Sequence, residues 1–146
     1  MTRATLALAL AAALLAAGGC AASLEDPDRF TGGGGCPDDV DVEADVFAVR
    51  CAGSICHSPG DEPAGGLDLL SDGVAARVAG VAASAECDGE VLAVPGDPDA
   101  SLLVRKLGAS PPCGDRMPLV GDLAPGDAAC IAEWIEGLPA AARAHR

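Results

Sequence analysis

The chain has 146 residues and a net charge of −13, with 22 acidic residues against nine Lys and Arg. This length suits one domain rather than two, and the acidic surplus without a basic patch argues against nucleic acid as a partner. Two Phe and one Trp are the only aromatic residues, which is few for a core of this size. The domain therefore needs a staple, such as disulfides or a large apolar cofactor.

The N-terminal segment, residues 1–19, is typical of an export signal. Arg3 supplies positive charge, and the apolar run Leu6–Ala17 is too short to span a bilayer. Small residues then lead into Cys20, and this arrangement resembles the lipobox of bacterial lipoproteins, with Ala17 where that family usually has Leu. The resemblance implies a lipid on Cys20 and a membrane anchor in the cell envelope, at the periplasmic or outer-membrane face. An ordinary small-residue cleavage site is the alternative.

Three further regions follow the signal. Residues 20–35 are acidic, contain Pro and end in four glycines, so we expect a flexible tether. Residues 36–139 form the expected domain, and residues 140–146 a C-terminal tail. Because no strand pattern of useful length occurs, the fold class is expected to be mostly α with long loops.

Two helices are expected in the first half of the domain. One covers Asp39–Arg50 and runs directly into Cys51. The other covers Ser71–Val78, with Ser71 or Asp72 as its N-cap. The apolar face of the first helix is Val42, Val46 and Val49, and its candidate caps are Asp38, Asp39 and Asp41.

Two more helices are expected in the second half. Asp97 caps the first of them, and Gly108 ends it. A Pro/Gly loop over Ala109–Asp122 follows and holds Met117. The last helix starts at Pro125 and ends at Gly137. Its apolar residues recur at helical spacing: Ile131, Trp134, Ile135 and Leu138.

The candidate chemistry lies in Cys51, Cys56 and His57, with Met117 further along the chain. Two thiols beside a histidine are typical of covalent haem attachment, usually in the pattern Cys-x-x-Cys-His. Four residues, Ala52–Ile55, separate the thiols here, so the extra residues must bulge outward. In this interpretation Cys51 and Cys56 form thioethers to the haem, and His57 and Met117 are the axial iron ligands.

Over about Asp39 to Leu138 the chain resembles the small class I c-type cytochrome domains of bacterial envelope proteins. The resemblance implies a cytochrome c-like helical domain that carries one covalent haem c and transfers electrons without enzymatic activity. It also implies a redox partner, whose docking surface we expect to be basic because this chain is acidic. The resemblance rests on the first helix leading into Cys56-His57, on the stretches Gly65–Leu69 and Val94–Leu103, on Arg116-Met117-Pro118, and on the last helix, Pro125–Gly137, with Trp134-Ile135.

Cysteine parity is consistent with this interpretation. Seven cysteines are an odd number for an exported protein, and lipidation of Cys20 leaves six. If Cys51 and Cys56 attach haem, four remain for disulfides that staple the fold. Among the connectivities that are possible, we expect the pairs Cys87–Cys113 and Cys36–Cys130.

A haem-free, disulfide-stapled lipoprotein with a structural or partner-binding role is the alternative. It would add a third disulfide, Cys51–Cys56, which a short loop permits. His57 would then be an exposed loop residue and Met117 would fill space in the core. A zinc site on Cys51, Cys56, His57 and one further thiolate is a third interpretation.

Overall fold

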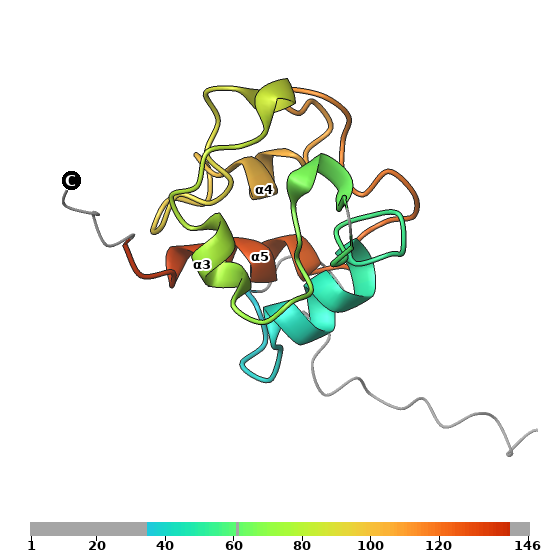
Figure 1. Cartoon of the computed structure of the whole chain (residues 1–146). Coiled ribbons are helices and arrows are strands. Elements are labelled where there is room, and N and C mark those ends of the chain that lie inside the picture. The colour runs from blue at the N-terminus through green and yellow to red at the C-terminus, as the bar shows by residue number, and fades with distance from the viewer. Residues whose placement is uncertain (1–34, 61, 141–146) are drawn as a thin grey trace, which may run out of the picture.

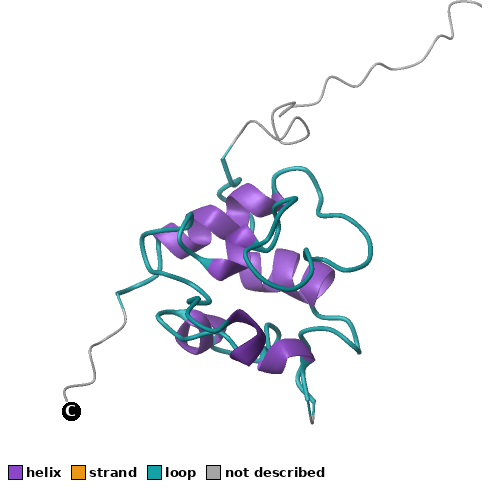
Figure 2. Ribbon diagram, turned by 90° about the horizontal axis from the view of Figure 1, so that it is seen from above, coloured by secondary structure: helices purple, strands orange, loops and turns teal. Residues whose placement is uncertain are grey.

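The computed structural model describes residues 35–60 and 62–140. The expected signal peptide, Cys20, nearly all of the tether and the tail beyond residue 140 lie outside these residues. Helices joined by long loops make up the described chain (Figure 2), which has isolated β-bridges and no strand. The expected fold class, mostly α with long loops, is confirmed at this level. Of the described helices, none is long and apolar enough to cross a membrane.

The first helix is the π-helix η2, Val42–Cys51. Of the three candidate caps, Asp41 takes this role, because its carboxylate accepts hydrogen bonds from the N–H groups of Glu43 and Ala44 at 3.0 and 3.2 Å. The helix therefore begins three residues after the expected start at Asp39. It runs into Cys51, as expected.

The expected apolar face of this helix was wrong at one position, Val49, whose side chain is 65% exposed. A π-helix forms i→i+5 hydrogen bonds, such as the one from the Ala52 N–H to the Phe47 carbonyl. It therefore places more residues in each turn than the about 3.6 of an α-helix. Val46 and Phe47 consequently share the buried side with Val42, while Val49 turns to solvent.

The short helix α3, Val74–Val78, begins later than expected. Its N-cap is Gly73 in a left-handed conformation (φ 81°), so the prediction of Ser71 or Asp72 was wrong. The cause is Asp68, whose carboxylate accepts the N–H groups of Leu70 and Ser71 at 2.8 and 3.0 Å. These bonds fold the residues before Gly73 into a turn. Two 3₁₀ turns accompany α3, η3 (Ala64–Gly66) and η4 (Ala85–Cys87).

The helix expected to start at Asp97 is α4, which covers only Leu102–Arg105. The Asp97 carboxylate accepts the Ala100 N–H at 3.0 Å. This hydrogen bond closes a turn that precedes the helix, so Asp97 does not cap the helix itself. Ser101 follows as the N-cap and is fully buried. Its hydroxyl donates to the Asp97 carbonyl and accepts the Val94 N–H, both at 2.8 Å. These bonds stabilise the turn in place of a longer helix.

The last helix, α5, covers Asp127–Glu136 and lies at the centre of the fold, where it packs against η2 and α4 (Figure 1). Gly137 ends it, as expected, but it begins at Asp127 and not at Pro125, because the N-cap is Gly126. Three of the four predicted apolar residues are buried. The fourth, Trp134, is half-buried and meets Phe47 of η2 edge to face, with ring centroids 5.3 Å apart. The core therefore forms chiefly where α5 crosses η2.

Two disulfides hold this arrangement together, and both expected pairs are confirmed: Cys36–Cys130 and Cys87–Cys113. The first ties the start of the domain to α5. The backbone N–H of Cys36 also donates to the Glu133 carboxylate at 2.9 Å. The disulfide and this hydrogen bond thus hold the N-terminal end of the domain against its last helix.

Candidate functional site

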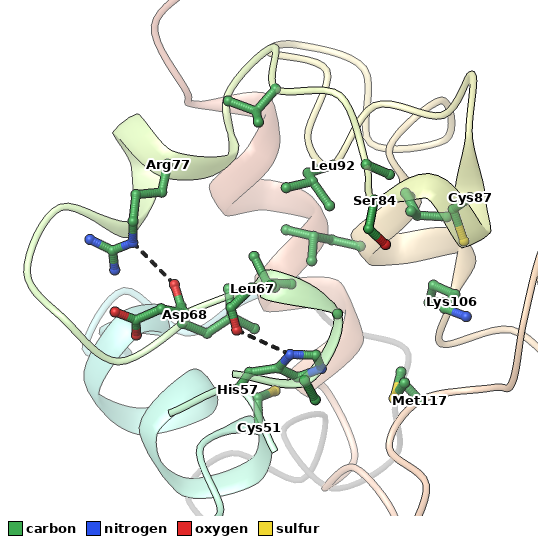
Figure 3. A pocket seen from close by; sticks show the side chains of 18 of the residues that line it. Cys51, His57, Leu67, Asp68, Arg77, Ser84, Cys87, Leu92, Lys106 and Met117 are labelled. Carbon is green, nitrogen blue, oxygen red and sulfur yellow. Dashed lines mark hydrogen bonds between the residues drawn. The ribbon is translucent and has the colours of Figure 1, made fainter. Parts of the chain in front are cut away.

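A cavity of about 710 Å³ opens between the loop after η2, the segment between α3 and α4, and the loop that precedes α5 (Figure 3). This volume lies within the range of about 300–1,000 Å³ that is usual for ligand and cofactor sites. Leu, Ala, Val, Phe and Ile side chains make up most of the wall. The polar side chains that line the cavity are His57, Asp68, Arg77, Ser84, Glu86, Lys106 and Asp115.

His57 is held at the wall of the cavity by three hydrogen bonds. Its backbone N–H donates to the Cys51 carbonyl at 3.1 Å, and its carbonyl accepts the Leu69 N–H at 2.8 Å. The ring Nδ1 lies 3.2 Å from the Leu67 carbonyl oxygen. Because a carbonyl oxygen can only accept, this partner places the proton on Nδ1 and leaves the lone pair on Nε2. A histidine that binds a metal is usually oriented in this way.

Met117 lines the same cavity, although it lies far from His57 in the sequence. Its backbone N–H donates to the Lys106 carbonyl at 2.8 Å, which joins the loop to the residue that follows α4. Figure 3 shows Met117 on the side of the cavity facing the free edge of the His57 ring. The structure therefore brings together the two residues that the sequence suggested as axial ligands.

Cys51 also lines the cavity, at the last residue of η2. Burial raises the pKa of this thiol from its ordinary 9.0 to about 11, with smaller contributions from the Asp127 carboxylate and from Cys56. Cys51 therefore contributes a buried thiol, protonated at neutral pH, to the wall of the cavity.

Cys56 is exposed and is not among the residues that line the cavity. The chain between the two thiols bulges outward, as expected, and Ile55 in this bulge is 89% exposed. The Cys56 N–H donates to the Gly53 carbonyl at 2.9 Å. A Cβ at Gly53 would lie 3.0 Å from the Cys56 Sγ, so the thiol lies against the glycine rather than over the cavity.

The two haem-free interpretations concern the same cysteines. Within the described residues, Cys51 and Cys56 are both free thiols, so the local disulfide is not formed. The other four described cysteines are paired with each other and supply no further thiolate for zinc. No group of three or more His, Cys, Asp and Glu in residues 35–60 and 62–140 is arranged to hold a metal ion.

A turn beside His57 supports the Leu67 and Leu69 backbone groups. Arg77 binds it from one side, donating to the carbonyls of Asp68 and Asp72 at 3.1 and 2.6 Å, and also to that of Ser71. The Ser71 hydroxyl, together with the backbone N–H bonds described above, lowers the pKa of the Asp68 carboxyl from 3.8 to about 2. Leu67, whose carbonyl binds the His57 ring, is thus next to a turn that these hydrogen bonds stabilise.

Sequence reasoning named the stretch Gly65–Leu69 only as part of a resemblance, and it assigned neither this stretch nor Arg77 and Lys106 to the support of the candidate ligands. Gly65-Gly66 before Leu67 marks the turn that presents the Leu67 carbonyl, with both glycines at positive φ (63° and 69°). Arg77 and Lys106 gave no signal, because each acts through hydrogen bonds to distant backbone carbonyls.

A scan against protein-family models and searches of curated proteins and of solved structures found no match to this chain. The function must therefore be inferred from the residues of the cavity.

Proposed function

We propose that this protein is an electron carrier of the bacterial cell envelope that holds one covalent haem c in this cavity. The observation that carries the proposal is that Cys51, His57 and Met117 line one apolar cavity of about 710 Å³. Haem, when bound, supplies a one-electron iron couple. The polypeptide supplies the ligands, the attachment points and the shielding from water.

The donor atoms fit a haem iron. His57 offers Nε2, because Nδ1 is engaged with the Leu67 carbonyl. Met117 offers a soft thioether from the facing side of the cavity. This pair of axial ligands is the one used by cytochromes c and raises the reduction potential. Haem would also supply the bulky apolar group that a domain with so few aromatic residues lacks.

The two free thiols fit thioether attachment, with one rearrangement. Cys51 already lines the cavity, and Cys56 directly precedes His57. The Cys56 side chain must turn away from Gly53 to reach a haem edge. Because this side chain is exposed and lies in a bulging loop, the turn requires no repacking of the core.

The location and partners belong to the same proposal. A lipid on Cys20 would hold the domain at a membrane, and the acidic chain would dock on a redox partner with a basic surface. We assign no catalytic residue, because the proposed work of this site is to carry electrons.

The test is production of the exported chain in a host with cytochrome c maturation, with a control cytochrome made alongside. Intact mass and the pyridine haemochrome spectrum of the denatured protein measure covalent haem. One haem per chain that survives denaturation supports the proposal, and the α-band position tells whether both thiols are used. A colourless protein from a host that matures the control would instead favour the disulfide-stapled structural or partner-binding module.

Replacement of Met117 tests the distal ligand. We expect Met117→Ala to keep the haem attached, to lower the reduction potential and to open a coordination position, because the thioether is lost. Val120→Ala is the matched control in the same loop, since its side chain is 89% exposed and does not line the cavity. A potential unchanged in Met117→Ala would remove Met117 from the ligands.

Replacement of His57 tests the proximal ligand. We expect His57→Ala to yield no mature holoprotein, because the attached group would lose its proximal ligand. The other histidine provides the control, so His145→Ala should mature like the parent chain. Normal haem content in His57→Ala would contradict the assignment.

A further inference from the structure

The loop that carries Met117 has no helix of its own, yet it is tied to the rest of the domain at several points. Cys113, four residues before Met117, forms the disulfide with Cys87. The Lys106 ammonium donates to the Cys113 carbonyl at 2.7 Å. The Lys106 carbonyl accepts the Met117 N–H at 2.8 Å. One lysine thus contacts both the disulfide-bonded cysteine and the candidate ligand.

The segments to which the Met117 loop is attached, α4 and the chain around Cys87, are themselves fixed to the domain. Lys106 is the C-cap of α4, and the first two N–H groups of that helix donate to the carbonyls of Val91 and Leu92 at 2.9 and 3.0 Å. Arg105 also forms an ion pair with Glu90. Cys87 is 7% exposed and lines the cavity. The Met117 loop is therefore attached to two anchored segments.

We infer that the Cys87–Cys113 disulfide and the Lys106 side chain are positioning groups that keep the Met117 thioether at the cavity. Figure 3 shows Lys106 between Cys87 and Met117. Without these ties, two hydrogen bonds near Met117 remain among the described residues: the backbone bond to the Lys106 carbonyl, and the bond from the Arg116 Nε to the Leu107 carbonyl at 3.0 Å. The inference deepens the proposed function, and its spectroscopic consequence rests on that function.

The second disulfide provides a matched control. Cys36–Cys130 joins the start of the domain to α5 and does not involve the Met117 loop. Each disulfide can be removed by a double Cys→Ser substitution. General destabilisation would follow from either change, whereas release of Met117 should follow only from loss of Cys87–Cys113.

The first experiment follows Met117 without requiring haem. Methionine labelled with ¹³C at the methyl group reports a single residue of the domain, because Met1 is the only other methionine, and Met117→Ala assigns the signal. We expect C87S/C113S to shift the Met117 methyl signal to the position of a solvated methionine and to narrow it. C36S/C130S should leave the signal in place. An unchanged signal in folded C87S/C113S, or the same shift in both doubles, would overturn the inference.

The haem-loaded protein gives the second readout. Loss of the charge-transfer band of the thioether–iron bond in C87S/C113S, with the band retained in C36S/C130S, supports the positioning role. Bands retained in both doubles would overturn it and leave the proposed function standing. Conversely, a haem-free parent chain whose Met117 signal shifts only in C87S/C113S supports the positioning role and refutes the proposed function.

Lys106 gives an independent test if the double variant does not fold. Lys106→Leu removes the hydrogen bond to the Cys113 carbonyl, keeps an apolar side chain and adds no second methionine signal to the domain. We expect it to shift the Met117 signal in the same direction as C87S/C113S, and Lys106→Arg to restore the parent position. A signal that stays in place in Lys106→Leu removes Lys106 from the positioning groups.

Discussion

At the scale of single residues, backbone carbonyls orient the site as much as side chains do. The Leu67 carbonyl selects the tautomer of His57, and the Lys106 carbonyl holds Met117. Carbonyl positions depend on the path of the chain rather than on residue type. The candidate ligands could therefore be proposed from residue type and order in the sequence, whereas the carbonyls that hold them could not.

Asp68 makes the turn beside His57 sensitive to acid. In the folded protein the pKa of its carboxyl is about 2, below the ordinary 3.8. The ionised carboxylate therefore stabilises the fold fully above pH 3.8, and this contribution is lost as the pH falls through about 2. We expect the Asp68 carboxyl signal in an NMR titration to have its midpoint near the lower value. Asp68→Asn should flatten this part of the stability profile, while Asp72→Asn serves as the control. A midpoint near 3.8 would show that the turn does not bind the carboxylate.

Ser101 is a buried polar residue that the sequence did not single out. Its hydroxyl satisfies the Val94 N–H and the Asp97 carbonyl, so Ser101→Ala leaves both without this partner. We expect a loss of about 1–3 kcal/mol in the free energy of unfolding, the usual cost of unsatisfied buried polar groups. Denaturant unfolding measures it. The exposed Ser110→Ala is the control, and equal stabilities of the two variants would contradict the role of Ser101.

At the scale of elements, the contact between η2 and α5 carries the core. Phe47 is 1% exposed and meets Trp134 edge to face, so its removal leaves a cavity in the middle of this contact. We expect Phe47→Ala to lower the free energy of unfolding by about 3–5 kcal/mol. Val49→Ala on the exposed side of the same helix should change it by about 0.5 kcal/mol or less. Similar losses in the two variants would contradict the π-helical register of η2.

Helix ends were predictable where a local signal acts alone, as with Gly137 at the end of α5. They were not predictable where a side chain has two possible partners. Asp97 caps a turn instead of a helix, and Asp68 draws Ser71 into a turn and away from α3. The register of η2 was missed for a different reason, since apolar spacing alone does not separate i→i+5 from i→i+4 winding. Competing short-range hydrogen bonds thus decided the lengths of the helices.

At the scale of the whole molecule, the two disulfide pairs could be suggested from the sequence, as one of several connectivities, because the remaining cysteines lie at the ends of the domain and on either side of one segment. The cavity could not. Its wall combines residues from η2 to α5, and only the folded chain shows which side chains meet there. The bulge between Cys51 and Cys56 was foreseen, but the direction of the Cys56 thiol was not, because it depends on contact with Gly53.

The Cys36–Cys130 bond also determines how the domain bears mechanical load. A pull between the segment before Cys36 and the chain after α5 passes through this covalent bond directly into the last helix. Residues 37–129 lie outside that load path and cannot be extended while the bond is intact. The cavity belongs to this shielded stretch, apart from Ile131 in its wall. Tension between the two ends would therefore leave His57 and Met117 where the fold places them.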